Sequence, residues 1–132
     1  MTRDGLIKYW TSSSDRDYKT MNHLFQSGDY GWALFIRHLV IEKILKAIYV
    51  KNVDDNVLFI HDLVRIAEKA KLGLTQEQKD ILDTLTLFNI KARYPDYKKE
   101  FYKKCTKGFT ENQIKKIRKI KVWLKKKIKE KS

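Results

Sequence analysis

Apolar side chains recur every three or four residues along most of the chain, which is the period of an amphipathic α-helix. No segment shows the strict alternation of apolar and polar residues that is typical of a strand. The pattern predicts helices over about residues 4–27, 30–51, 60–71, 75–93 and 110–130, and a short helical piece within 97–107. Short connections make neighbouring helices pack antiparallel. We therefore expect an all-α fold, an up-and-down antiparallel bundle of four to five helices.

Several residues indicate where these helices begin and end. Thr75 and Gln78 have the spacing of a capping box, and Thr110 and Gln113 repeat it at the start of the last helix. Gly73 is expected to end the helix before Thr75.

The segment 30–51 has the broadest apolar surface of the chain, and Asp29 is available as its N-cap. One apolar face comprises Trp32, Phe35, Ile36, Leu39, Val40, Ile44 and Ala47, and it is widened by Leu34, Ile41, Leu45 and Ile48. We expect this helix to be the most buried one.

Length and composition narrow the class of protein. The 132 residues favour a single domain over residues 1–132. One Pro and five Gly are too few for a many-stranded β protein. Cys105 is the single cysteine, which excludes an internal disulfide and suits a reducing compartment. The most apolar stretch, residues 32–50, is interrupted by charged side chains, so we expect a cytoplasmic protein with no membrane partner.

The net charge of +13 is concentrated near the C-terminal end. Residues 97–132 hold 15 basic and 3 acidic side chains, whereas residues 1–96 hold 14 and 13. The basic surface that we expect on the helix of about residues 110–130 consists of Lys115, Lys116, Lys119, Lys126 and Lys127. This asymmetry favours a polyanionic partner, with nucleic acid or nucleotide ahead of anionic lipid. The alternative is that the lysines only keep the chain in solution.

The sequence contains no recognisable metal-binding motif and no glycine-rich phosphate loop. His23, His38 and His61 lack the partners and spacing of metal ligands. We therefore expect no metal and no other cofactor, and any chemistry must use polar residues of a helical cleft.

Three polar residues accompany apolar helix faces, and a fourth precedes a helix. Asp17 lies on the core side of its helix, and Glu42 and Lys46 are four residues apart beside the apolar face of the next one. A buried acid costs several kcal/mol unless it is paired, so these residues either meet partners or line a polar cleft. The alternative is an exposed pair worth about 0.2–0.5 kcal/mol. His61, followed by Asp62, either marks a helix start or faces the same cleft.

The run Arg93-Tyr94-Pro95-Asp96 places a cation, a phenol and an acid at a helix end. It is either a simple helix stop or an anion-binding corner, in which the guanidinium binds phosphate and the tyrosine ring stacks on a base.

Five features in order resemble the HEPN domain (higher eukaryotes and prokaryotes nucleotide-binding), over about residues 6–124. They are Trp10 with Asp17, the run 28–33 (GDYGWA), the run 42–47 (EKILKA), the run 61–63 (HDL) and the run 92–96 (ARYPD). The chain is most similar to the small prokaryotic members that are paired with minimal nucleotidyltransferases. The resemblance implies a helical bundle, a homodimer, and a toxin–antitoxin-like pair with a nucleotidyltransferase partner.

The resemblance also provides a test for catalysis. HEPN ribonucleases carry an arginine followed, after four to six residues, by a histidine, but the positions that match from Arg93 are Lys98, Lys99 and Glu100. Arg16 and His23 have the spacing on the first helix, where the motif is not expected. We therefore expect a nucleotide- or RNA-binding module without an intact ribonuclease motif. Its expected cleft comprises Arg93, Tyr94, Asp96, Glu42, Lys46, His61 and Asp17. The alternative is an atypical metal-independent ribonuclease toxin.

Overall fold

The computed structural model describes residues 2–56, 59–93, 100 and 103–130, with the backbone alone at residues 92 and 93. Its helices are α1 (Arg3–Gln26), α2 (Tyr30–Asn52), α3 (Leu63–Lys69), α4 (Gln76–Arg93) and α6 (Lys107–Lys129). The described residues contain no strand, so the all-α fold class is confirmed. Of the piece expected within 97–107, residues 100, 103 and 104 are helical, and residues 97–99, 101 and 102 lie outside the described residues.

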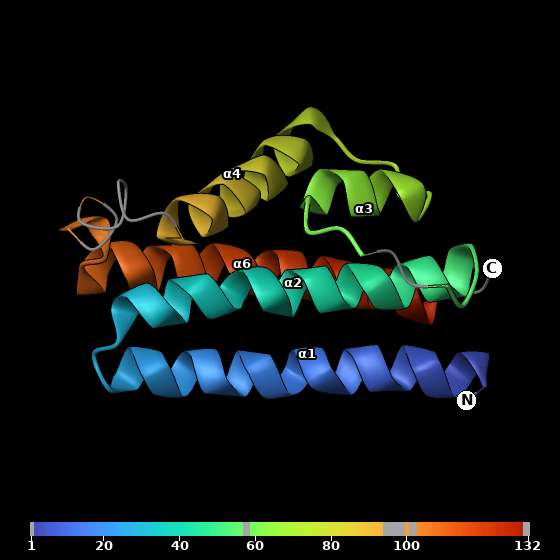
Figure 1. Cartoon of the computed structure of the whole chain (residues 1–132), viewed down its shortest axis with the longest axis horizontal. Helices are drawn as coiled ribbons and strands as arrows, with labels where there is room; N and C mark the ends of the chain where they lie inside the picture. The colour runs from blue at the N-terminus through green and yellow to red at the C-terminus, as the bar shows by residue number, and fades with distance from the viewer. Residues whose placement is uncertain (1, 57–58, 94–99, 101–102, 131–132) are drawn as a thin grey trace.

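The bundle is arranged around α2, which packs against α1, α3, α4 and α6. In Figure 1, α1 runs antiparallel to α2 along one side, α6 lies behind α2, and α3 and α4 cover the remaining side. Most of α2 is buried, including Ile41, Ile44 and Ile48 with no exposed surface. The breadth of its apolar surface in the sequence therefore corresponds to contacts on every side.

Trp32 is an exception to the expected apolar face of α2, because its side chain is 57% exposed. Successive residues of a helix are rotated by about 100°. Ala33 and Leu34 take the inward positions of the same turn and are buried, so Trp32 projects to solvent and packs edge-on against Phe35 at a centroid distance of 5.8 Å.

The start of α4 agrees with the predicted capping box. The backbone N–H of Gln78 donates to Thr75 Oγ1 at 3.1 Å, and the backbone N–H of Thr75 donates to Gln78 Oε1 at 2.9 Å. The end of α3 differs from the prediction. Lys71, rather than Gly73, takes the left-handed conformation with φ of 64°, and α3 is shorter than the predicted segment.

The second predicted capping box is wrong. Helix α6 begins at Lys107, and its N-cap is Thr106, whose Oγ1 accepts from the backbone N–H of Phe109 at 3.2 Å. Thr110 lies a full turn inside the helix and is buried. Gln113 is thereby free to contact another helix, and spacing alone could not distinguish the two threonines. Asp29 is the N-cap of α2 as expected, but its side chain makes no capping hydrogen bond.

Hydrogen bonds join three helices at the end of the bundle where α1 begins. Arg3 Nε donates to the carbonyl oxygen of Val50 at 3.0 Å, and Lys51 Nζ donates to the carbonyl oxygen of Lys127 at 2.8 Å. Cations therefore satisfy carbonyl groups in the last turns of α2 and α6, where the helix dipole is negative. Within the described part of the chain, none of the helices has both the length and the apolar character needed to cross a bilayer.

Candidate functional site

Three of the predicted cleft residues meet in one polar cluster on α2, which we call the Glu42 cluster (Glu42, Lys46, His61 and His38). Lys46 Nζ lies 3.1 Å from Glu42 Oε2, and His61 Nδ1 lies 2.8 Å from Glu42 Oε1. His38 Nδ1 is 3.7 Å from the same Oε1, and its Nε2 lies 3.0 Å from the carbonyl oxygen of His61. The cluster thus joins α2 to the segment that leads into α3.

The Glu42–Lys46 pair is not an exposed pair at the edge of the apolar face. Glu42 is 4% exposed and Lys46 is 8% exposed, and Lys46 Nζ also lies 5.3 Å from the ring centroid of Trp10 on α1. Because both charges are removed from water, each depends on the other for compensation.

His61 is the part of the Glu42 cluster that faces solvent, with 62% of its side chain exposed. Its neighbour Asp62 is the N-cap of α3 and accepts from the backbone N–H of Arg65 at 3.2 Å. Of the two alternatives for this pair, the helix start is therefore confirmed at Asp62, and the placing of His61 in a cleft stays a prediction. A carboxylate bound to one ring nitrogen fixes the orientation of an imidazole, and an imidazole exposed in this way can exchange protons with a ligand.

Asp17 lies outside the Glu42 cluster. Its carboxylate pairs with Lys43 across the α1–α2 contact, with Oδ2 2.6 Å from Lys43 Nζ, and both side chains are 22% exposed. Asp17 therefore forms an ion pair that links α1 to α2, and it does not lie with Glu42, Lys46 and His61.

The predicted anion-binding corner falls on the part of the chain that the structure leaves undescribed. Helix α4 ends at Arg93, but the Arg93 side chain, Tyr94 and Asp96 all lie outside the described residues. Arg16 and His23, the pair with ribonuclease-motif spacing, are both exposed on α1.

The predicted basic surface lies on α6. Lys115, Lys116, Lys119 and Lys126 are exposed, whereas Lys127 is half-buried and pairs with Glu130 at 3.4 Å. Lys115 lies 3.7 Å from Glu111 one turn away. Lys116, Lys119 and Lys126 form no ion pair with any described residue, so their charges are available to an external anion.

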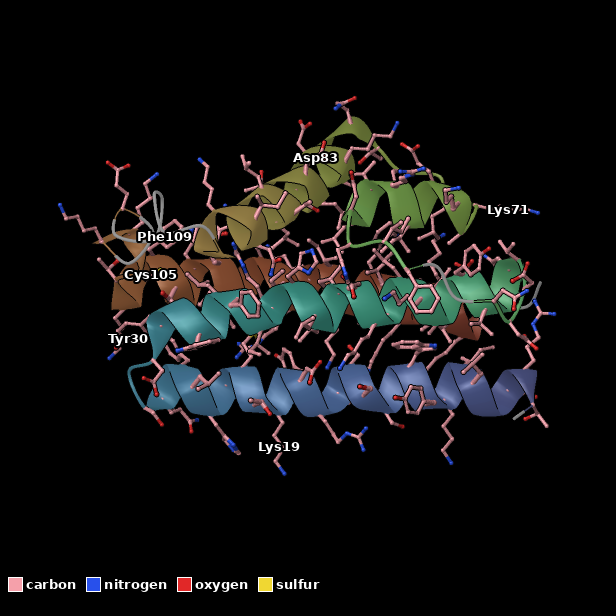
Figure 2. The ribbon with its side chains drawn as sticks, in the orientation of Figure 1. Lys19, Tyr30, Lys71, Asp83, Cys105 and Phe109 are labelled. Carbon is pink, nitrogen blue, oxygen red and sulfur yellow. The ribbon has the colours of Figure 1, made fainter. Side chains whose placement is uncertain are left out.

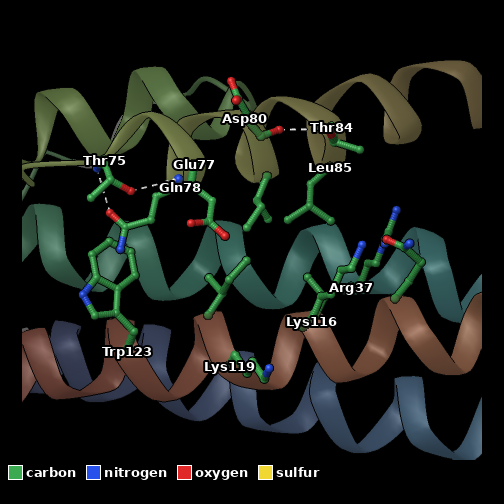
Figure 3. A pocket seen from close by; sticks show the side chains of 14 residues that line it. Arg37, Thr75, Glu77, Gln78, Asp80, Thr84, Leu85, Lys116, Lys119 and Trp123 are labelled. Atoms are coloured by element: carbon green, nitrogen blue, oxygen red, sulfur yellow. Dashed lines mark hydrogen bonds between the residues drawn. The ribbon is translucent and has the colours of Figure 1, made fainter.

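A groove of about 770 Å³ runs between α4 and α6 (Figure 3). Its apolar floor is formed by Ile81, Leu85, Ile117 and Ile120. Arg37 and Lys116 lie at one end, and Trp123 lies at the other end beside Thr75 and Gln78. We call this feature the α4–α6 groove. Sequence analysis did not identify it, because helical periodicity does not show which faces of two separate helices meet.

Arg37 is the residue of the α4–α6 groove that sequence reasoning missed. It is 2% exposed, its Nη1 donates to Gln113 Oε1 at 2.8 Å, and its guanidinium carbon lies 4.7 Å from the ring centroid of Phe88. Its Nη2 is buried and has no hydrogen-bond partner among the described residues. Burial lowers the pKa of Arg37 to about 10, with the nearby Cys105 acting in the opposite direction. The available signal was a single arginine within the most apolar helix.

Cys105 and Phe109 lie at the end of the bundle where α2 begins at Tyr30 (Figure 2). Cys105 packs with Leu34 in a small apolar cluster. Burial raises the pKa of the Cys105 thiol, and the charge of Arg37 offsets part of this effect. The thiol is therefore a packing group and not an activated nucleophile.

No group of three or more His, Cys, Asp and Glu side chains suitable for a metal ion occurs among residues 2–56, 59–91, 100 and 103–130. The acidic and imidazole groups of the Glu42 cluster are instead bonded to one another and to Lys46.

Comparisons with known proteins agree with this architecture. The sequence matches the family model of the HEPN domain over residues 7–128. The crystal structure of TT1696 from Thermus thermophilus superposes with a TM-score of 0.77 at 18% sequence identity, over 92% of this chain and 97% of that chain. No curated protein matches the sequence. The structural likeness shows a shared fold, and the family match confirms the resemblance to the HEPN domain.

Proposed function

Because the chain belongs to the HEPN domain family, we propose that it works as a nucleotide- or RNA-binding module without an intact ribonuclease motif. The family supports a nucleotide- or RNA-related role. The choice of binding over cleavage rests on the absence of histidine at residues 98–100.

The observation that carries this proposal is the uncompensated lysine face of α6. Lys116, Lys119 and Lys126 are exposed and have no acidic partner among the described residues. Phosphate groups bind such lysines by displacing counterions, which makes the affinity depend strongly on salt. A face that served only solubility would not need its charges on one helix.

The Arg93 corner is the second part of the proposal. Arg93 would bind phosphate, Tyr94 would stack on a base, and Asp96 would orient the arginine. The Glu42 cluster would supply polar groups to the same ligand through His61, the member with the most exposed side chain. Asp17 would act indirectly, because its ion pair with Lys43 holds α1 against α2.

The test is one incubation of the purified protein with end-labelled RNA in EDTA, analysed on a native gel and on a denaturing gel. We expect a native shift without cleavage. Replacing Lys116, Lys119 and Lys126 together by alanine should abolish the shift at moderate salt. If all five lysines of the basic surface contact phosphates, RNA affinity should fall by about 10²-fold between 50 and 200 mM salt.

The matched control replaces three exposed lysines of other helices, Lys8, Lys19 and Lys69, by alanine. It has the same net charge and should retain the shift. Equal losses in both triple variants would mean that only net charge matters, which contradicts a specific α6 surface. Arg93→Ala, included alongside, should weaken the shift if the corner binds phosphate.

The partner proposal follows from the family subgroup that the motifs resemble. We infer that the chain acts as a single domain over residues 1–132, forms a homodimer, and works in the cytoplasm with a minimal nucleotidyltransferase in a toxin–antitoxin-like pair. Light scattering on the purified chain should give twice the monomer mass of 15.8 kDa. Co-expression with a nucleotidyltransferase encoded beside it should give a stable complex, and separate elution of the two proteins would contradict the pairing.

A metal-independent ribonuclease is the second candidate, and the Glu42–His61 contact favours it. The exposed ring of His61, held by a buried carboxylate at 2.8 Å, is a suitable acid or base. Cleavage on the denaturing gel that is lost in His61→Ala, but retained in His23→Ala, would establish this activity and overturn the non-catalytic proposal.

A further inference from the structure

We propose that the α4–α6 groove binds one nucleoside polyphosphate, with the phosphates at Arg37 and Lys116 and the base beside Trp123. This inference rests on the proposed function and deepens it, because it assigns the ligand class and its orientation to a defined site. The two ends of the groove and its length support it.

The Arg37 end of the groove is suited to an anion. Arg37 is 2% exposed, and none of the described carboxylates lies within ion-pair distance of its guanidinium. A buried charge without a counter-charge is strongly unfavourable, whereas a bound phosphate would supply that charge and accept from the unused Nη2. Lys116, one turn along α6 from the Gln113 that binds Arg37, adds a second cation at the same end.

The opposite end of the groove is suited to a base and a sugar. Trp123 lines it from α6 and offers an aromatic ring for stacking. Glu77 lines it from α4 with its carboxylate directed towards α6, whereas the Asp80 carboxylate points away from α6, as Figure 3 shows. Carboxylates repel phosphate but accept hydrogen bonds from ribose hydroxyl groups. The charges therefore fix the direction of the ligand, with its sugar towards α4 Glu77 and its phosphates towards Arg37.

The same charges distinguish a mononucleotide from a strand of RNA. In RNA each sugar is flanked by phosphates on both sides, so a strand in this groove would place a phosphate near Glu77. A nucleoside polyphosphate carries its phosphates on one side alone. The preferred occupant is therefore a free nucleotide.

The length of the groove requires more than one phosphate. Gln113 and Trp123 are ten residues apart on α6, which corresponds to about 15 Å along the helix axis. Lys119 lies between them and lines the groove beside the path of the ligand. A volume of about 770 Å³ is within the range of small-molecule sites. A single phosphate would satisfy Arg37 and leave the aromatic end empty.

The experiment is calorimetric titration of the purified chain with ATP in EDTA, with adenosine and inorganic triphosphate as partial ligands. We expect saturable ATP binding and weaker binding of each part. Lys116→Gln should weaken ATP by about 10-fold or more, because it removes a charge-assisted contact. Lys107→Gln, an exposed lysine of α6 that does not line the groove, is the matched control and should bind ATP like the unmodified protein.

Arg37→Met removes the buried cation but keeps a side chain of similar length, and it should weaken ATP binding. If Arg37→Met does not fold, the affinity of Lys116→Gln for ATP tests the groove assignment. Tryptophan fluorescence gives a second measure, since quenching by ATP should vanish in Trp123→Phe and persist in Trp32→Phe. Equal weakening by Lys116→Gln and Lys107→Gln overturns the groove assignment. RNA binding without ATP binding overturns this inference and leaves the proposed function intact, whereas ATP binding without an RNA shift supports the groove and refutes the α6 RNA surface.

Discussion

Glu42→Ala provides the sharpest test of how the polar cluster contributes to stability. The substitution leaves Lys46, whose side chain is 9% exposed, without its counter-charge at 3.1 Å, and it leaves His61 without its partner at 2.8 Å. Removing one member of a buried ion pair costs about 3–5 kcal/mol, because the remaining charge stays buried without compensation. An exposed pair at the same spacing would cost about 0.2–0.5 kcal/mol. The two values differ roughly tenfold.

The measurement is urea denaturation followed by far-ultraviolet circular dichroism. For a urea dependence of about 1–3 kcal/mol per molar, a loss of 3 kcal/mol moves the midpoint by about 1 M or more. Glu111→Ala is the matched control, since Glu111 and Lys115 have the same spacing in an exposed pair 3.7 Å apart. It should change the midpoint by only a small fraction of that amount.

A double variant distinguishes the loss of one charge from the loss of both charges. Glu42→Leu combined with Lys46→Met removes both charges at once, and replacement of a buried pair by apolar groups is often neutral or stabilising. We expect the double variant to be more stable than Glu42→Ala alone. A cost below about 1 kcal/mol for Glu42→Ala, or a double variant less stable than the single one, would refute the interpretation of the cluster as a compensated buried pair.

Three further predictions concern the helix ends and one surface ion pair. Thr106→Ala should lower the free energy of unfolding by about 1 kcal/mol through loss of the α6 cap. Thr110→Val should be neutral or stabilising, because Thr110 Oγ1 is buried without a partner among the described residues. Thermal denaturation compares the stabilities of the two variants. Gly28→Ala should destabilise the protein by about 1 kcal/mol in the same assay, because Gly28 has φ of 83°, a conformation that strains an L side chain even though no neighbouring atom obstructs a Cβ. An unchanged stability in Gly28→Ala would contradict this strain argument. Burial opposes ionisation of Asp15, but its hydrogen bond to Lys125 and the charges of Lys125 and Lys121 hold its pKa below the ordinary value of 3.8. The stabilisation by Asp15, below about 1 kcal/mol for this half-exposed pair, is therefore complete above that value and lost as the pH falls through the lower folded pKa. Asp15→Asn should remove this part of the acid dependence of urea midpoints, and unchanged dependence would contradict the assignment.

The fold could be predicted in large part from the sequence because helical periodicity and capping are local. The Thr75–Gln78 capping box forms as the spacing predicts. The failure at Thr110 shows the limit of the method, since Thr106 one turn earlier is an equally good cap and only packing decides between them. The depth to which α2 is buried follows from its apolar breadth, but the outward turn of Trp32 depends on which neighbours take the inner positions.

The candidate site could be predicted only where its contacts lie within one helix. The Glu42–Lys46 pair is visible as a four-residue spacing. The contact of Glu42 with His61 crosses 19 positions, and that of Arg37 with Gln113 crosses 76, and no local pattern encodes such a pairing. Arg37 illustrates the consequence, because in the sequence it only interrupts an apolar stretch, whereas in the structure it anchors one end of the α4–α6 groove.

The central position of α2 has a consequence for synthesis of the protein on the ribosome. The α1–α2 hairpin leaves the ribosome first, with Ile44 and Ile48 still uncovered on the sides that α3, α4 and α6 later occupy. From the end of α2 to the end of α6, translation at 5–20 residues per second takes about 4–15 s. The nascent chain therefore exposes an aggregation-prone apolar surface for several seconds, until α6 leaves the ribosome and covers it. Chaperones that bind nascent chains would act in this interval, and truncation within α6 should trap the chain in its aggregation-prone form.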